Sequence, residues 1–147
     1  MRILGLDVGT KTVGVAVSDP LGILATGVTT TERTGIRKDT GKVIDYIREY
    51  GCETVVIGLP LSLDGNDSVQ TQKVRDFRTM LENKLRSSGP LSKVRVEWQD
   101  ERYSTVEAEE VLIEADMSRE DRKKIIDRQA AIVILQRYLD RMPRKDQ

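Results

Sequence analysis

The first apolar segment of this chain contains an acidic residue. Asp7 follows the apolar run 3–6, and a glycine-bearing turn at 9–11 leads into a second β-forming run at 13–18. This pattern predicts a strand over 2–8, a tight turn and a second strand. An aspartate among buried β-forming residues is costly unless it is paired, hydrogen-bonded or bound to a cation. The segment therefore predicts a hairpin with a positive group beside Asp7.

Residue types that are missing or scarce limit the chemistry. The sequence contains no histidine and one cysteine, Cys52. Histidine-based catalytic triads, Cys-His pairs, zinc clusters and disulfides are therefore excluded, and Cys52 is expected to be a small buried residue. An enzyme with this composition must use carboxylates, Lys or Arg side chains, hydroxyls and a hard metal ion.

Charge and aromatic content constrain the partners. The chain has 24 Lys and Arg residues against 24 Asp and Glu residues, and only 4% of its residues are aromatic. A protein that binds nucleic acid mainly by bulk charge is expected to be basic, and a single-strand binder usually has an aromatic platform. Basic stretches at 33–42 and 119–128 and an acidic one at 107–114 are interpreted first as solvated helix faces. Any nucleic acid should therefore be recognised by shape or through a partner such as the ribosome.

Hydrophobic periodicity predicts the elements. Strand patterns cover 2–8, 13–18, 22–29, 54–59 and 94–98, and helical spacing covers 34–50, 74–89, 104–115 and 118–142. The order β-β-β-α-β-α-β-α predicts an α/β fold with a mixed five-stranded sheet and helices on both faces. No linker divides the chain, so residues 1–147 are expected to form one domain. Since neither a leader nor a membrane-spanning run is visible, a cytoplasmic location without membrane association is expected.

Acidic residues recur where ligands collect in such sheets, beyond the carboxyl ends of the parallel strands. Asp7 ends the first strand, and Asp100 and Glu101 follow the fifth. Asp127 begins an apolar stripe on the final helix, one turn before Ala131, and small residues there allow the helix to approach the sheet closely. Converging carboxylates repel one another unless cations neutralise them, which favours a site for Mg²⁺ or Mn²⁺.

Each acid also has a simpler interpretation. Asp127 can pair with Arg128 or another neighbouring cation, and Asp100 and Glu101 can be loop acids bound to Arg102. Asp7 is harder to explain in this way, because its strand is short and apolar. The coincidence of three acidic points at one edge favours the metal site.

Several motifs, in order along nearly the whole chain, resemble one family. They are residues 5–11, 14–19, 58–61 with Asp64-Gly65, 100–102 with Ser104-Thr105, and Ile126-Asp127 with 130–131 and 134–136. This set resembles the YqgF/RuvX family. The resemblance implies a ribonuclease-H-like fold and a nuclease, either a Holliday-junction resolvase or an enzyme that processes the 5′ end of precursor 16S rRNA. It also implies that Asp7, Glu101 and Asp127 are the catalytic, metal-binding acids, with Glu101 preferred over Asp100. Two divalent ions can activate water and stabilise the leaving oxygen in such cleavage.

Five further positions are candidates for substrate contacts. Lys11 could contact a phosphate, although a solvated turn lysine is an equal alternative. Arg102 and Thr105 could hold a phosphate at a helix N-terminus, although capping alone explains Thr105. Gly58 and Pro60 could shape a loop that a nucleic-acid backbone approaches closely, or simply end a strand.

Rival functions are weighed against the nuclease. The Asp-x-Gly-Thr turn at residue 7 also resembles the first phosphate loop of actin-like ATPases, but the chain is too short for the second domain that encloses their nucleotide. A non-catalytic RNA-binding assembly factor would gain nothing from repelling carboxylates. Among nucleic acids, precursor rRNA is favoured over branched DNA, because a monomer or weak homodimer suits one cut and a junction resolvase needs paired sites.

Overall fold

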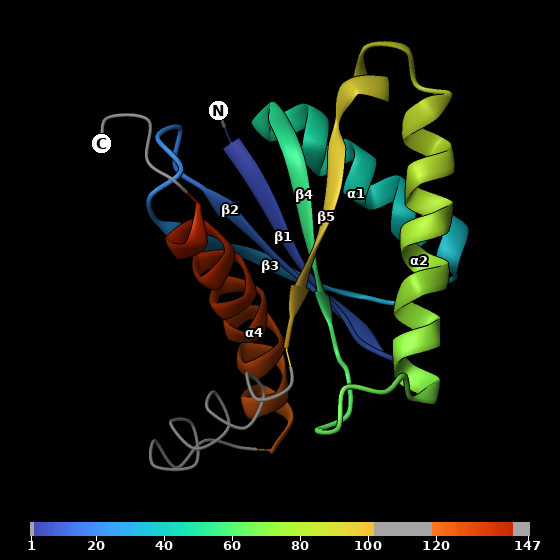
Figure 1. Cartoon of the computed structure of the whole chain (residues 1–147), viewed down its shortest axis with the longest axis vertical. Helices are drawn as coiled ribbons and strands as arrows, with labels where there is room; N and C mark the ends of the chain where they lie inside the picture. Colours follow the sequence, from blue (N-terminus) through green and yellow to red (C-terminus); the bar gives the residue numbers. More distant parts are fainter. Residues whose placement is uncertain (1, 102–118, 143–147) are drawn as a thin grey trace.

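Five strands form one mixed sheet in the order β3-β2-β1-β4-β5 (Figure 1). They are β1 (Arg2–Val8), β2 (Thr12–Ser18), β3 (Ala25–Glu32), β4 (Cys52–Leu59) and β5 (Arg95–Asp100). The neighbours β1, β4 and β5 are parallel, whereas β1 with β2 and β2 with β3 are antiparallel. The computed structural model describes residues 2–101 and 119–142, with side chains in the second range from residue 129 onward. It confirms the predicted α/β fold with a mixed sheet.

Helices cover both faces of this sheet, as predicted. Helices α1 (Ile36–Tyr50) and α2 (Val69–Arg86) lie on one face, followed by the short 3₁₀ segment η1 (Gly89–Lys93), and α4 (Arg119–Arg141) lies on the other (Figure 1). The helix predicted over 104–115 falls outside the described residues. Among the helices of the described ranges, none is both long and apolar enough to cross a membrane.

The alternation of side chains along β1 divides the core into two layers. Leu4 and Leu6 belong to the layer beneath α1 and α2, and Ile3 belongs to the layer beneath α4. Successive side chains of a strand point to opposite faces, so Asp7 shares the α4 face with Ile3 and Gly5. Position in the strand therefore aims the first predicted acid at the same face as the final helix.

The third strand begins later than the predicted range of 22–29. Asp19 explains the shift, since its carboxylate accepts hydrogen bonds from the backbone N–H groups of Ile23 and Leu24 at 2.7 and 3.2 Å. These bonds hold residues 19–24 in a tight loop before β3 starts at Ala25.

Helices α1 and α2 each begin where a side chain accepts hydrogen bonds from backbone N–H groups. Asp39 accepts from the N–H groups of Thr34 and Gly35, which stay outside α1, so the helix starts at Ile36 instead of 34. Ser68 and Thr71 form a capping box, and α2 starts at Val69, five residues before the apolar stripe begins.

Candidate functional site

The carboxyl ends of β1, β4 and β5 point to one edge of the sheet. Because these strands are parallel, their last residues meet there, and the amino-terminal end of α4 lies at the same edge (Figure 1). We refer to this region as the carboxyl edge. It is the part of an open α/β sheet where ligands usually bind.

Asp7 lies half-buried on β1 at the carboxyl edge, level with Gly14 of β2. Two residues earlier on the same face, β1 is in close contact with α4. A Cβ atom on Gly5 would lie 2.6 Å from the Cβ of Leu135 and 3.3 Å from the carbonyl oxygen of Ala131. The absence of a side chain at Gly5 therefore lets α4 run close to the strand that carries Asp7.

Asp127 lies within α4, one helical turn before Ala131. Ala130 and Ala131 are 1% and 0% exposed, which confirms the predicted close approach of this helix. A spacing of four residues places position 127 on the same stripe as Ala131, one turn nearer the amino-terminal end of the helix. The side chain of Asp127 is outside the described part of the chain, so its convergence with Asp7 stays a prediction.

Glu101 follows β5 and is held in place by two hydrogen bonds, one through its backbone and one through its side chain. Its backbone N–H donates to the carbonyl oxygen of Leu59 at 3.1 Å, which places it beside the end of β4. Its side chain is 4% exposed, and its Oε2 accepts a hydrogen bond from Nη1 of Arg137 at 3.0 Å. Asp100, one residue earlier, is exposed, so Glu101 is the more enclosed of the two acids.

Arg137 did not figure in the sequence-based predictions. In the simpler interpretation, the partner of Glu101 was Arg102, which lies outside the described residues together with Thr105. A signal for Arg137 did exist, since it follows Ile134 by three residues and so shares a helix stripe with a buried core position. The guanidinium compensates the buried charge of Glu101, which would otherwise be costly.

Gly58 lies inside β4, between the strands that lead to the two described acids. Leu6 pairs with Ile57, so Asp7 follows at the level of Gly58 on one side, and a Cβ on Gly58 would lie 3.3 Å from Cγ of Glu101 on the other. The same Cβ would lie 2.5 Å from Cδ1 of Ile134. Gly58 is therefore a strand residue that makes room for α4, and its predicted role in substrate contact stays a prediction.

The backbone of the turn after Asp7 is held by hydrogen bonds from residues elsewhere in the chain. The carbonyl oxygen of Val8 accepts from Nε2 of Gln70 at 3.0 Å, and that of Gly9 accepts from Nη1 of Arg33 at 3.0 Å. The backbone N–H of Arg33 also donates to the carbonyl oxygen of Lys11 at 2.8 Å. Lys11 itself is exposed, so the turn has a fixed backbone and a solvent-accessible cation.

Asp39 holds Arg33 in this position. Its carboxylate accepts from Nε of Arg33 at 2.9 Å, and the residue is only 3% exposed. Burial alone would raise the pKa of Asp39, but the hydrogen bonds from Thr34 and Arg33 and the positive charge of Arg33 outweigh it and lower that pKa. The buried ion pair thus links the start of α1 to the turn that follows Asp7.

Pro60 begins the connection from β4 to α2. Its carbonyl oxygen accepts a hydrogen bond from Oγ1 of Thr71 at 2.7 Å, so this residue is tied to the first turn of α2. Pro60 therefore lies at the carboxyl edge. This hydrogen bond does not test its predicted contact with substrate, which stays a prediction.

The donor set at the carboxyl edge suits a hard divalent cation. Asp7 and Glu101 offer carboxylate oxygens, the ligand type that Mg²⁺ and Mn²⁺ prefer, and the chain has no histidine to compete. Within the described side chains, no three acidic or cysteine residues gather into a group that could hold a metal. The sequence predicts Asp127, whose side chain lies outside the described part of the chain, as a third ligand at this edge.

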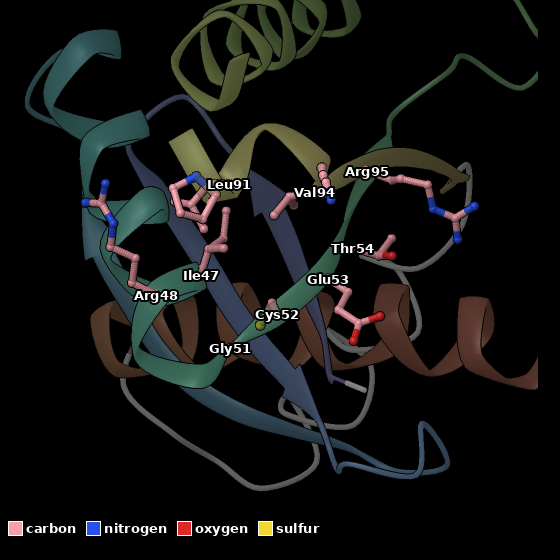
Figure 2. Close-up of a pocket in the computed structure, with 11 residues that line it drawn as sticks. Ile47, Arg48, Gly51, Cys52, Glu53, Thr54, Leu91, Val94 and Arg95 are labelled. Atoms are coloured by element: carbon pink, nitrogen blue, oxygen red, sulfur yellow. The ribbon is translucent and has the colours of Figure 1, made fainter. Parts of the chain in front are cut away.

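A hollow of about 700 Å³ lies at the opposite end of the sheet (Figure 2). Ile47, Leu91 and Val94 line it, while Arg48 and Arg95 extend away from them. Cys52, also in its wall, is buried, and burial raises the pKa of its thiol to about 11. None of the predicted site residues lines this hollow, and at neutral pH it offers no reactive thiolate.

Comparisons with known proteins give consistent results. The family model described as "RuvX: Holliday junction resolvase" matches residues 1–141. A relative from Clostridium perfringens (strain SM101 / Type A) is 46% identical over 142 residues, covering 97% of this chain and 98% of its own length. A relative from Moorella thermoacetica is also 46% identical over 142 residues, covering 97% and 96%. Both are named as proposed pre-16S rRNA nucleases.

Solved structures resemble the fold at low sequence identity. The fowlpox virus Holliday junction resolvase has a TM-score of 0.55 at 12% identity, covering 95% of this chain and 98% of that one. The Thermus thermophilus RuvC complex with a Holliday junction substrate has a TM-score of 0.53 at 11% identity, covering 95% and 94%. These likenesses confirm the predicted ribonuclease-H-like fold.

Proposed function

Because the chain belongs to the RuvX family, we propose that it is a nuclease, a hydrolase that cleaves phosphodiester bonds in nucleic acid with the help of divalent cations. One observation carries the proposal. Asp7 and the enclosed Glu101 lie on either side of Gly58 at the carboxyl edge, in a fold shared with junction-cleaving enzymes. Carboxylates at this place suit metal-assisted hydrolysis and do not require histidine.

The catalytic acids of the proposal are Asp7, Glu101 and Asp127, with Asp100 as an outer candidate ligand. Together they would hold Mg²⁺ or Mn²⁺, in our proposal two ions. A divalent ion at these oxygens supplies Lewis-acid chemistry, since it makes water a better nucleophile and neutralises charge that develops on the phosphate.

Other residues of the chain keep this edge in shape. Arg137 holds the carboxylate of Glu101, and Gln70 and Arg33 hold the backbone of the turn after Asp7. A fixed turn keeps Lys11 at the edge, where its ammonium group can pair with a substrate phosphate. We assign Arg102 and Thr105 to phosphate contacts as well, from their place in the sequence after Glu101.

For the substrate, we favour the 5′ end of precursor 16S rRNA, with the ribosome as a partner of the chain. The names of relatives at 46% identity support this choice. The balanced charge supports it too, since gripping four duplex arms by their phosphates calls for a basic protein. The second candidate is a four-way DNA junction, which the description of the family favours. Two symmetric cuts would require a dimer with paired sites.

Parallel cleavage assays test the proposal. The full chain is incubated with 5′-extended 16S rRNA and with a four-way DNA junction, in Mg²⁺, in Mn²⁺ and in EDTA. We expect cleavage of the RNA that depends on the divalent ion, with the junction left intact. Paired symmetric nicks in the junction with uncut RNA would select the second candidate, and metal-independent cleavage would refute the proposed mechanism.

A further inference from the structure

The loop of residues 60–68 joins β4 to α2 and spans the carboxyl edge. At its start, Leu59 accepts a hydrogen bond from the backbone N–H of Glu101 at 3.1 Å. Just past its end, Nε2 of Gln70 donates to the carbonyl oxygen of Val8 at 3.0 Å, next to Asp7. One end of the loop is thus beside each described acid, and any substrate at that edge lies close to it.

Hydrogen bonds within the loop fix its shape. Asp64 accepts from the hydroxyl of Ser62 at 2.9 Å and from the backbone and side-chain N–H groups of Asn66, both at 3.0 Å. The hydroxyl of Ser62 also lies 2.6 Å from the carbonyl oxygen of Asn66, and Gly65 adopts a φ of 87° that favours glycine. A loop ordered before binding loses little conformational entropy when it meets a ligand.

Two large aliphatic side chains are exposed on or beside this loop. Leu63 is 66% exposed, and Val69, the first residue of α2, is 78% exposed. A single exposed aliphatic residue is ordinary on a protein surface. These two differ because Leu63 lies within an ordered loop at the edge that carries the acids, and Val69 directly follows that loop.

The charges of the loop argue against contact with phosphates. From 60 to 69 the chain contains Asp64 and Asp67 and no basic residue. Asp67 is already paired with Arg75, at 2.9 and 3.1 Å. An acidic, apolar loop repels a phosphate backbone and suits the flat apolar face of a base.

We propose that Leu63 packs against an unpaired nucleobase next to the bond that is cleaved, and that Val69 borders the same contact. This inference rests on the proposed function and adds a property of its substrate. The face of a base is accessible to leucine only where the base is not stacked within a continuous helix. The preferred substrate is therefore single-stranded or unpaired at the point of cleavage, and its recognition there is apolar and independent of the base identity.

The test combines a protein change with a substrate change. Leu63→Ala is compared with the wild type on a labelled single-stranded RNA, intact or with one abasic nucleotide placed in turn at each position around the cleaved bond. The matched control is Leu21→Ala, because Leu21 is 80% exposed in the β2–β3 loop at the opposite end of the sheet (Figure 1). Dissociation constants are measured by fluorescence anisotropy in EDTA, and KM and kcat in Mg²⁺.

We expect Leu63→Ala to weaken binding of intact RNA and to raise KM, each about fivefold, as suits partial burial of a leucine side chain. Leu21→Ala should change neither, and Leu63→Phe should restore binding. With the abasic nucleotide at one particular position, wild type and Leu63→Ala should bind equally.

Equal behaviour of Leu63→Ala and Leu21→Ala on intact RNA would overturn the inference, as would a Leu63→Ala defect that persists at every abasic position. Wild-type protein that binds RNA without cleaving it would instead refute the proposed function. In that case the binding comparison would still test whether Leu63 contacts a nucleobase.

Discussion

Asp7 and Glu101 lie at the same edge of the sheet in different surroundings. Glu101 is enclosed and paired with Arg137, whereas Asp7 is half-buried within a strand and faces the helix that carries Asp127. Removing one partner of a buried ion pair destabilises a protein, whereas removing a carboxylate that repels other acids relieves that repulsion. Single substitutions can therefore separate the structural from the catalytic role of each acid.

Asp7→Asn should abolish cleavage and spare the fold. The amide keeps the shape of the side chain but is a weaker cation ligand, and it removes repulsion among the proposed acids when no metal is bound. We expect activity near background and an unchanged or slightly higher melting temperature in EDTA, measured by calorimetry beside the cleavage assay.

The control for this change is Asp45→Asn, an exposed position on α1, which should keep full activity. Full activity of Asp7→Asn would contradict the proposed mechanism. Marked unfolding of Asp7→Asn would show that the carboxylate has a structural role instead.

For single residues, the sequence predicts the candidate site residues better than it predicts the side chains that they contact. Asp7 stood out because a carboxylate interrupts an apolar strand. Glu101 is more enclosed than Asp100, and the preference for it as the metal ligand stays a prediction. The ion pair between Glu101 and Arg137 joins residues 36 positions apart, and no local spacing rule specifies such a contact. Long-range side-chain pairs of this kind depend on how α4 lies across the sheet.

Among the elements, the packing of α4 on β1 and β4 governs the geometry of the carboxyl edge. Gly5 and Gly58 have no side chain at the two points where α4 crosses the strands, and Ala131 on the helix has only a methyl group. Interfaces this tight tolerate added volume poorly. The position of α4, and with it that of Asp127, should be sensitive to a single methyl group on β1.

Gly5→Ala should displace α4 and reduce catalysis. The new Cβ would lie 2.6 Å from the Cβ of Leu135 and 3.3 Å from a backbone oxygen, and neither atom can rotate away. We expect a loss of about 1–3 kcal/mol in the free energy of unfolding, as for other overpacked sites. Cleavage at a temperature where the variant is folded should fall at least tenfold, because Asp127 moves with the helix.

Gly41→Ala on α1 is the matched control. There the nearest atom to a new Cβ is the flexible Nζ of Lys84 at 3.6 Å, so stability should stay the same or rise by up to about 1 kcal/mol. Wild-type stability and activity in Gly5→Ala would show that α4 is not packed on β1 in this way.

The start of α1 should give the protein an acid-sensitive contact. The pKa of Asp39 lies below its ordinary value, so the stabilisation it provides is complete above about pH 4, near the pKa of an unfolded aspartate. That stabilisation is lost as the pH falls through the lower pKa of the folded state. In urea titrations, wild type should lose more stability than Asp39→Asn between about pH 4 and pH 2. Parallel pH profiles for the two proteins would contradict this account.

The bounds of the strands were predicted well where the pattern of apolar residues is local. Strands β1, β2 and β4 were expected within two residues of their observed bounds, because their apolar runs are short and bounded by turns. The start of β3 was wrong by three residues, since the carboxylate of Asp19 holds a longer loop than turn statistics suggest. Side chains that hydrogen-bond to the backbone explain where the observed bounds of these elements differ from the predicted ones.

At the scale of the whole molecule, the two ends of the sheet have different character. The carboxyl edge carries the half-buried Asp7, the enclosed Glu101, an anchored turn and an ordered loop. The opposite end carries the hollow between α1 and β5 with Cys52 in its wall (Figures 1 and 2). Composition alone excluded histidine and zinc chemistry, but the sequence did not reveal the hollow, which arises only from the packing of distant segments. The central claim is that the carboxyl edge, with acids from β1, the end of β5 and α4, is the metal site.

Iron-directed cleavage of the polypeptide tests this claim most directly. Fe²⁺ replaces Mg²⁺ at carboxylate sites, and with ascorbate and peroxide it cuts the chain close to the bound ion, at positions that mass spectrometry identifies. We predict three clusters of cuts, around Asp7, Glu101 and Asp127, all suppressed by excess Mg²⁺ and lost in Asp7→Asn. Cuts confined to one segment, cuts around Cys52, or a pattern that Mg²⁺ leaves unchanged would contradict the proposed convergence of these acids.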